Sequence, residues 1–374
     1  MRVRRSQLDT KFSEYHESTY PKRCNRWLAT LIVILLLMLP TTASADSFWC
    51  TWFPWWPQCR NDENAISSCG ERLTEVSEFG SNPGNLKMCI YVPENLESSR
   101  PLVVALHGCN QQAADYDDET GWIKFADRHQ FALLLPQQKD ANNTSQCFNW
   151  FQPNDSERDQ GEALSIRQMI EKMVADTGID QQKVYVTGLS AGGGMATVML
   201  AAYPDMFAGG AIIAGIPYRC ATNAGEALGQ CGVGLVPDQL VPMKDLSPDD
   251  WGNLVRSASN YNGPFPRVSI WHGTDDTTVN PATQQELVDQ WTNVLGIDQT
   301  PDSEDTINGH EHKLYENDNG DTLVETVLIS GMSHGTPIDP GDEGDQCGAA
   351  GPFILDVGIC SSFHIIKFWG LDSQ

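Results

Sequence analysis

The stretch that most constrains what this chain can fold into lies near its middle, where residues 184–195 read VYVTGLSAGGGM. A run of residues with high β propensity precedes a G-x-S-x-G sequence at 188–192, and a helical pattern follows it. A sharp strand-to-helix turn needs glycine at both flanks, because side chains there would collide with the elements that they join. Such a turn lifts the hydroxyl of Ser190 out of a sheet. The pattern therefore predicts Ser190 as a nucleophile.

A nucleophilic serine needs a general base, and the chain has only eight histidines. His334 lies in the turn sequence SGMSHGTP, directly after the last expected strand and with no helical face to pack. The other histidines end strands before glycine, lie in an acidic stretch, lie in helices or precede residue 45; they are His107, His272, His310, His312, His129, His364 and His16. We therefore predict His334 as the base.

The base in turn needs an orienting carboxylate, expected after a strand between Ser190 and His334. The sequence SIWHGTDDTTVNP supplies Asp275 and Asp276 directly after an expected strand at 268–271. Both are also natural turn formers, and their spacing from the strand does not separate them. The order serine, aspartate, histidine is that of α/β-hydrolases and differs from the orders in chymotrypsin and subtilisin.

Two backbone N–H groups are expected to hold the oxyanion of such a site. The first belongs to Ala191, at the start of the helix that follows Ser190. The second is expected in the loop after an early strand, VVALHGCNQQ, where Gly108 permits a tight turn. A disulfide at Cys109 would hold that residue's N–H in place. The alternative is that this HG sequence is merely a turn.

Short apolar runs alternate with helical patterns along the chain, which predicts a mostly parallel sheet with helices on both faces, an α/β fold. The acidic stretch 298–321 is interpreted as an excursion between core elements. The expected strands are 88–92, 102–106, 132–135, 184–187, 211–214, 268–271 and 324–329. The expected helices are 121–129, 162–177, 192–203 and 281–295, the second of them ended by Gly178.

The first 45 residues have the organisation of a secretory signal peptide. Basic residues precede an apolar run at 28–39, and the small residues Ala43, Ser44 and Ala45 follow it. This run is too short to span a bilayer comfortably, which takes about 20 residues. We expect cleavage near Ala45 and secretion, extracellular or periplasmic. An uncleaved membrane anchor is the alternative.

The cysteines agree with secretion, because one of the eleven, Cys24, lies in the leader and an even number remains. This predicts up to five disulfides, for which nearest-neighbour pairing is our hypothesis. The pairs would be Cys50–Cys59, Cys69–Cys89, Cys109–Cys147, Cys220–Cys231 and Cys347–Cys360. Neither C-x-x-C nor H-x-x-x-H spacing occurs. We therefore predict no metal site.

The chain is strongly acidic, with a formal net charge of −25. Residues 1–45 carry seven Lys and Arg against three Asp and Glu, so their removal brings the net charge to about −29. Such a surface repels nucleic acid and anionic membranes, which excludes nucleic acid as an expected partner. The charge says little about the substrate.

An aromatic segment, SFWCTWFPWWPQCR at 47–60, would lie close to the mature N-terminus. Its tryptophans are Trp49, Trp52, Trp55 and Trp56. Two interpretations stay open: the segment packs on the rest of the protein as core or lid, or it is a disulfide-closed platform that adsorbs to a hydrophobic polymer. The expected organisation is thus a leader at 1–45, an aromatic extension at 46–84 and a catalytic domain at 85–374.

Six ordered blocks resemble the secreted polyhydroxybutyrate depolymerase family of esterases, which is similar in turn to feruloyl and acetylxylan esterases. The blocks are PLVVALHGCNQ, CFNWFQP, VYVTGLSAGGGMA, HGTDDTTVNP, SHGTPIDPG and DVGICSSFHIIKFWG, and the resemblance runs from about residue 85 to 371. It implies an α/β-hydrolase fold, stapled here by disulfides, and a Ser-His-Asp triad without metal or cofactor.

The resemblance also implies roles for particular residues. The family's H-G-x-x-D-x-x-V pattern selects Asp276 over Asp275, and its HGC block places the second oxyanion donor on Cys109. Trp150 matches an aromatic residue expected to wall the substrate crevice. Phe148 departs from the tryptophan of relatives, so any hydrogen bond of that indole is lost. Multi-domain relatives carry a C-terminal polymer-binding module that we do not expect here, which leaves adsorption to the catalytic domain itself.

The sequence therefore predicts a secreted serine esterase that acts on a poly(3-hydroxyalkanoate) or its oligomers. A feruloyl or acetylxylan esterase acting on plant polysaccharide is the alternative within enzymes. A second alternative, from another class, is a non-catalytic secreted binding protein on a hydrolase scaffold.

Overall fold

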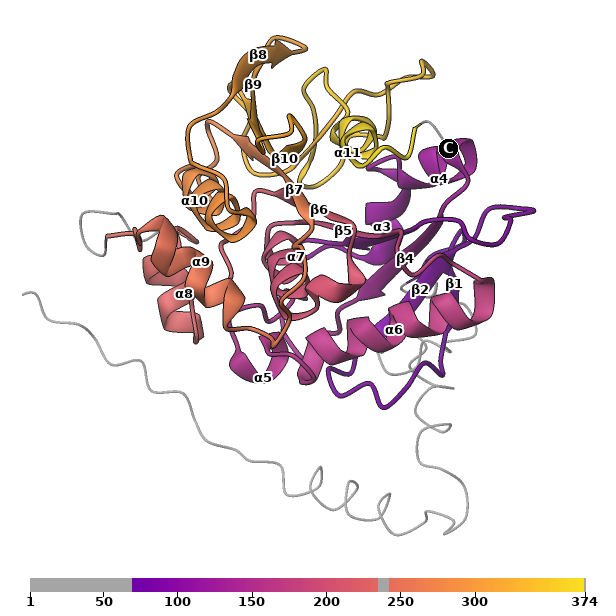
Figure 1. Ribbon diagram of the computed structural model, residues 1–374. Coiled ribbons are helices and arrows are strands. Elements are labelled where there is room, and N and C mark those ends of the chain that lie inside the picture. The colour runs from indigo at the N-terminus through magenta and orange to yellow at the C-terminus, as the bar shows by residue number, and fades with distance from the viewer. Residues whose placement is uncertain (1–68, 235–241, 373–374) are drawn as a thin grey trace, which may run out of the picture. The chain divides into compact units, whose positions relative to one another are not determined.

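The computed structural model describes residues 69–234 and 242–372, and within them the chain forms a large twisted sheet (Figure 1). Its strands are β1 (Thr74–Val76), β2 (Lys87–Tyr91), β3 (Leu102–Leu106), β4 (Ala132–Gln137), β5 (Val184–Leu189), β6 (Gly209–Ile213), β7 (Arg267–Gly273), β8 (Ser303–Ile307), β9 (His310–Glu316) and β10 (Thr322–Ile329). A separate small sheet pairs β11 (Thr336–Ile338) with β12 (Ile354–Asp356).

The large sheet is mostly parallel, as predicted. The strand order is β1-β2-β4-β3-β5-β6-β7-β10-β9-β8. The pairs from β4 through β3, β5, β6 and β7 to β10 are parallel. Antiparallel strands extend both edges, β2 and β1 on one side and β9 and β8 on the other. Because parallel strands share one direction, their carboxyl ends meet at a single edge of the sheet.

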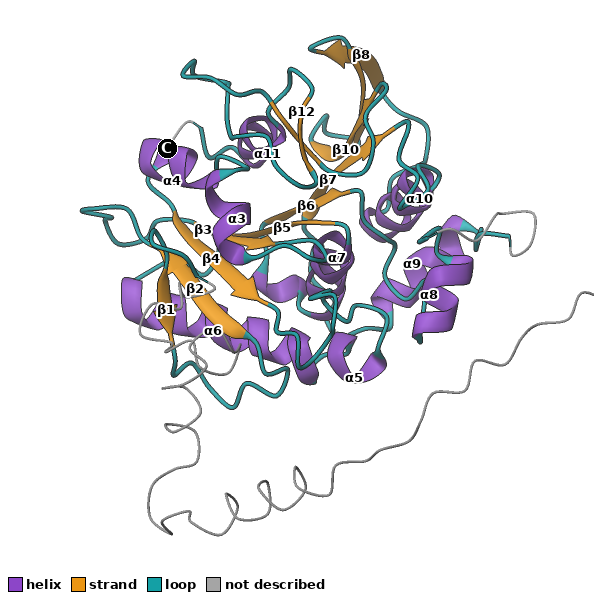
Figure 2. Ribbon diagram, turned by 180° about the vertical axis from the view of Figure 1, so that it is seen from behind, coloured by secondary structure: helices purple, strands orange, loops and turns teal. Residues whose placement is uncertain are grey.

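Helices cover both faces of this sheet, which Figures 1 and 2 show from opposite sides. Those whose buried residues join the core of one face are α6 (Gly161–Thr177), α7 (Ala191–Ala202), α8 (Ala224–Gln230), α9 (Pro248–Arg256) and α10 (Thr283–Leu295). Those of the other face are α3 (Ala113–Asp118), α4 (Trp122–His129) and α11 (Ser361–Trp369). A four-residue helix, α5 (Pro153–Ser156), precedes α6.

Side chains of the central strands pack into the cores on both faces of the sheet, which explains why these strands are unbroken apolar runs in the sequence. In β3, Leu102, Val104 and Leu106 belong to one core, whereas Val103 and Ala105 belong to the other. Successive side chains of a strand point to opposite faces, so a strand buried on both sides must be apolar at every position. This is the signal that made the predicted strands visible in the sequence.

The predicted strands and helices are confirmed within a few residues at their ends. The acidic stretch 298–321 is more regular than the interpretation as an excursion implied, because it forms β8 and β9 and lengthens the sheet. The first four residues of β8, Ser303–Thr306, are exposed. An edge strand that buries almost nothing leaves no apolar pattern, and nothing in its composition distinguishes it from a loop.

Four of the five predicted disulfides are confirmed, and Cys50–Cys59 lies outside the described residues. The bonds are Cys69–Cys89, Cys109–Cys147, Cys220–Cys231 and Cys347–Cys360. Disulfides persist in oxidising compartments, so these bonds favour a protein that leaves the cytosol. Among the described helices, none is both long and apolar enough to cross a bilayer. The predicted leader and the aromatic segment at 47–60 also lie outside the described residues.

Candidate active site

Ser190 occupies a strained turn between β5 and α7. Its φ is +57°, in a region that non-glycine residues rarely adopt. The flanking glycines are required sterically: a Cβ on Gly188 would overlap the backbone of Gly192, and one on Gly192 would overlap the carbonyl oxygen of Leu106. This turn ends with Ala191 at the first position of α7, where backbone N–H groups have no partner within the helix.

Three segments bring the predicted site residues to the same edge of the sheet. Ser190 follows β5, Asp276 lies three residues beyond β7, and His334 lies five residues beyond β10. The loops after β7 and β10 pass very close to each other, because a Cβ on Gly273 would overlap the carbonyl oxygen of Met332. The backbone N–H of Asp275 also donates to that carbonyl group at 3.0 Å.

A buried hydrogen bond joins the two loops. His334 Nδ1 lies 2.7 Å from Asp276 Oδ2, and both residues are buried. The other carboxylate oxygen of Asp276 accepts the backbone N–H groups of Thr278 at 2.8 Å and Val279 at 2.9 Å. Asp275, the residue that spacing alone left as an equal candidate, is exposed. The structure therefore places the carboxylate of Asp276, and not that of Asp275, against His334.

A second histidine supports the same carboxylate. His272 Nε2 lies 3.3 Å from Asp276 Oδ2 and 3.0 Å from the carbonyl oxygen of Val279. Both neighbours are acceptors, so this nitrogen carries the proton. Burial would raise the pKa of Asp276, but the hydrogen bonds from His272 and His334 outweigh it and lower the pKa below its ordinary value. Asp276 is thus held ionised, as a residue that steadies an imidazolium must be.

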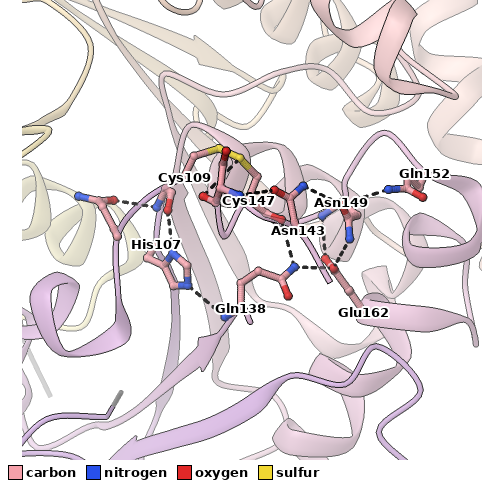
Figure 3. Close-up of a disulfide and its surroundings, with 11 residues drawn as sticks. His107, Cys109, Gln138, Asn143, Cys147, Asn149, Gln152 and Glu162 are labelled. Carbon is pink, nitrogen blue, oxygen red and sulfur yellow. Dashed lines mark hydrogen bonds between the residues drawn. A yellow bond between two sulfur atoms is a disulfide. The ribbon is translucent and has the colours of Figure 1, made fainter. Parts of the chain in front are cut away.

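The loop after β3 carries the predicted second oxyanion donor and is braced from several sides (Figure 3). Cys109 is bonded to Cys147. The backbone N–H of Gly108 donates to Gln111 Oε1 at 2.8 Å. His107 Nε2 accepts the backbone N–H of Gln138 at 3.2 Å, so its Nδ1 donates to the carbonyl oxygen of Gly108 at 2.7 Å. Burial lowers the pKa of His107 to about 4, which keeps this imidazole neutral.

Two aromatic residues of the segment 147–151 have separate positions. The indole of Trp150 lies directly over the first turn of α7, since a Cβ on Gly194 would come within 2.8 Å of its Cγ. Phe148 is fully buried, and its ring centroid lies 4.9 Å from that of His107. Phe148 therefore packs beneath the loop that carries Cys109.

Sequence reasoning missed a buried acid that organises this segment. Glu162, in the first turn of α6, is fully buried and accepts hydrogen bonds from the side chain of Gln138 and from the backbone and side chain of Asn149 (Figure 3). Burial and the charge of Asp155 raise its pKa to about 8, against the effect of these donors. An acidic residue in the first turn of a helix is ordinary, so no pattern distinguished Glu162.

A different histidine also contacts acids. His312 Nδ1 lies 2.7 Å from Asp305 Oδ1, and its Nε2 lies 3.3 Å from Glu325 Oε2. Glu325 also accepts the hydroxyl of Ser269 at 2.6 Å. Within residues 69–234 and 242–372, no three His, Cys, Asp or Glu side chains are grouped so as to hold a metal ion.

Comparisons with known proteins agree with this geometry. Residues 86–306 match the family described as esterase PHB depolymerase. The chain is 53% identical over 306 residues to poly(3-hydroxyalkanoate) depolymerase C of Paucimonas lemoignei, covering 82% of this chain and 72% of that protein. It is 33% identical to feruloyl esterase B of Talaromyces stipitatus, over 71% of this chain and 73% of that one.

A solved structure is also similar. Acetyl xylan esterase from Aspergillus awamori superposes with a TM-score of 0.65 at 26% identity, covering 80% of this chain and all of that one. These relatives are carboxylic ester hydrolases, and the segment at 86–306 spans more than half of this chain. The chain is therefore a carboxylic ester hydrolase with an α/β fold, and it belongs to the esterase PHB depolymerase family.

Proposed function

We propose that this esterase hydrolyses poly(3-hydroxyalkanoates) or their oligomers through Ser190, His334 and Asp276. The observation that carries the proposal is the buried 2.7 Å contact between His334 Nδ1 and an ionised Asp276, at the sheet edge where the strained turn holds Ser190. The similarity to a poly(3-hydroxyalkanoate) depolymerase supports the choice of substrate.

In the proposed reaction, Ser190 Oγ attacks the ester carbonyl carbon while His334 Nε2 takes the hydroxyl proton. The Asp276 carboxylate keeps the proton on Nδ1 and stabilises the imidazolium that forms. The backbone N–H groups of Ala191 and Cys109 hold the oxyanion. The intermediate collapses as His334 gives the proton to the leaving alcohol oxygen. Water, deprotonated by the same imidazole, then attacks the acyl-enzyme and releases the acid.

Two assays separate the substrate classes. We expect the mature protein to clear a suspension of polyhydroxybutyrate and to release little ferulate from methyl ferulate. Ferulate release without clearing would support the feruloyl alternative, which the similarity to feruloyl esterase B keeps open. Trp150, over the first turn of α7, is the proposed wall of the crevice. Trp150→Ala should therefore slow clearing more than it slows hydrolysis of p-nitrophenyl acetate.

We also propose that the protein is secreted after cleavage near Ala45 and adsorbs to the polymer through Trp49, Trp52, Trp55 and Trp56. The disulfides support an oxidising compartment, and the tryptophans lie outside the described residues. N-terminal sequencing of protein from the culture medium tests the cleavage. Deletion of 46–60 should weaken polymer adsorption and spare hydrolysis of a soluble ester. Joint loss of both activities and of thermal stability would instead identify the segment as part of the core.

A further inference from the structure

A tight turn near the C-terminus holds a phenylalanine in an unfavourable conformation. Gly351 and Ile354 exchange backbone hydrogen bonds in both directions at 3.0 Å, which leaves Pro352 and Phe353 as the two central residues. Phe353 has φ +61°. Proline followed by a residue with positive φ is the type II arrangement, in which the third position favours glycine or asparagine. A bulky residue there is strained, because its Cβ crowds the following carbonyl oxygen.

The side chain of Phe353 is only partly buried. It is 40% exposed, and the other exposed large apolar side chains among the described residues are Val92 and Leu228. The turn therefore keeps a strained apolar ring partly open to solvent. Strain of this kind persists where surrounding structure holds it, and it is concentrated at functional sites.

The surrounding structure holds this turn against the proposed active site. The ring centroid of Phe353 lies 6.0 Å from that of His334, with the rings 72° apart. The carbonyl oxygen of Phe353 accepts the backbone N–H of Thr336 at 2.8 Å, two residues beyond His334. The carbonyl oxygen of Pro352 accepts from Gln111 Nε2 at 3.0 Å. Gln111 in turn binds Gly108, so the turn is anchored both to the base and to the oxyanion loop.

We propose that Phe353 contacts the alcohol portion of the ester and favours apolar alcohols. The assignment rests on the proposed role of His334 as the base. That imidazole must reach the leaving alcohol oxygen to give it a proton, so the group bonded to this oxygen is the substrate portion nearest the ring of Phe353. The anchored turn thus holds an apolar wall beside the leaving group.

The test uses butyrate esters with a fixed acyl group and a growing alcohol, from methyl to hexyl butyrate, followed by acid release. Phe353→Gly should lower kcat/KM for hexyl butyrate by about tenfold and leave methyl butyrate within about twofold. The same variant removes the strained Cβ, so its melting temperature should lie about 2–4 °C above that of Phe353→Ala. Phe353→Ala keeps Cβ and should lose the alcohol preference to the same extent as Phe353→Gly.

Two controls make the outcome decisive. Val92→Ala shortens another exposed apolar residue, next to the start of β4 at the opposite edge of the sheet, and should change neither property. Esters with a fixed methanol and acyl groups from acetyl to hexanoyl should keep their relative rates in Phe353→Gly. An unchanged alcohol series, an equal loss on every ester, or a shift confined to the acyl series would overturn the proposal. Failure of the proposed triad is separate, because it appears as an active Ser190→Ala.

Discussion

Two histidine–aspartate pairs in this protein have the same short contact, and only one of them is proposed to be catalytic. His334 lies 2.7 Å from Asp276 at the carboxyl edge of the sheet, and His312 lies 2.7 Å from Asp305 on the hairpin of β8 and β9. A serine is present in both neighbourhoods. The distance between base and acid therefore does not distinguish the two sites.

The serines differ in backbone position. Ser190 lies on a turn with positive φ at the start of a helix, after its strand has ended. Ser269 lies within β7, is fully buried, donates to Glu325 and accepts the indole N–H of Trp271 at 2.7 Å. The hydroxyl of Ser269 thus makes its hydrogen bonds inside the core and is not accessible to a substrate.

The surroundings of His312 also favour its charged form. Burial would lower the pKa of His312, but hydrogen bonds to Glu325 and Asp305 raise it above its ordinary value, which favours imidazolium. An imidazolium cannot accept a proton from serine, so this raised pKa disfavours His312 as a base. The comparison teaches that a short acid–histidine contact is not enough, and that the serine must lie on a turn outside its strand to act as a nucleophile.

The largest expected difference in activity is the one between the variants of the two serines. Ser190→Ala should lower kcat by about 10⁴–10⁶-fold, because the nucleophile is lost. Ser269→Ala should leave kcat within about threefold, but should lower the free energy of unfolding by about 1–3 kcal/mol, since Trp271 and Glu325 each lose a buried partner. Turnover of p-nitrophenyl acetate and urea unfolding measure the two effects. Comparable activity losses in both variants would remove the distinction drawn here.

The variants of the two aspartates should show the second-largest difference in activity. Asp276→Asn should lower kcat by about 10⁴-fold, as expected when the imidazole loses its orienting carboxylate, and Asp305→Asn by less than about twofold. Asp276 has a lowered pKa, so its ionised form stabilises the fold above its ordinary pKa, and this contribution is lost as pH falls below about 4. Unfolding of wild type and Asp276→Asn should therefore converge toward low pH. A constant difference across pH would contradict this linkage.

Glu162 offers a further contrast with Glu325. Glu162 is buried among uncharged hydrogen-bond donors, whereas Glu325 contacts His312. Glu162→Gln would point an amide N–H at another donor, either Gln138 or Asn149, and should lower the free energy of unfolding by about 1–3 kcal/mol. Because the pKa of Glu162 is raised, the contribution of this residue to stability is complete below about pH 4 and falls as pH rises toward about 8.

Urea unfolding of wild type and Glu162→Gln at pH 4.5, 6 and 8 measures how the contribution of Glu162 to stability depends on pH. The stability advantage of wild type should shrink as pH rises, because the amide of the variant does not titrate. Glu171→Gln, on the exposed side of the same helix, is the matched control and should show no such trend. An advantage that grows with pH would contradict the pKa direction assigned to Glu162.

The smallest expected effect is that of His312. His312→Gln should leave kcat unchanged and lower the free energy of unfolding by about 0.5–1 kcal/mol, a value limited by solvent screening of its pair with Asp305. Because the pKa of His312 is raised, its contribution is complete below about pH 6.5 and is lost as pH rises through the folded pKa. Melting curves at pH 5.5 and 9 measure the difference, and an effect larger at pH 9 would refute the assignment.

Much of the fold and part of the site were predictable from local sequence. The strand–turn–helix around Ser190 and the apolar runs of β3 and β5 are visible because each is set by neighbouring residues and a simple period. The hairpin of β8 and β9 was missed, because an exposed edge strand leaves no apolar signal. Glu162 and Phe353 were missed since each looks ordinary in sequence.

The sequence by itself determined the fold class and the turn that holds Ser190, whereas the disulfide pairing was a hypothesis that the structure confirmed within the described residues. Only the tertiary structure brought His334 into contact with Asp276, set Phe353 beside the same imidazole and engaged the hydroxyl of Ser269 in a buried hydrogen bond to Glu325. The reason is physical. Hydrophobic period and turn chemistry act between residues near in sequence, whereas these contacts join residues 19 to 58 positions apart, which meet only when the sheet has aligned its strand ends.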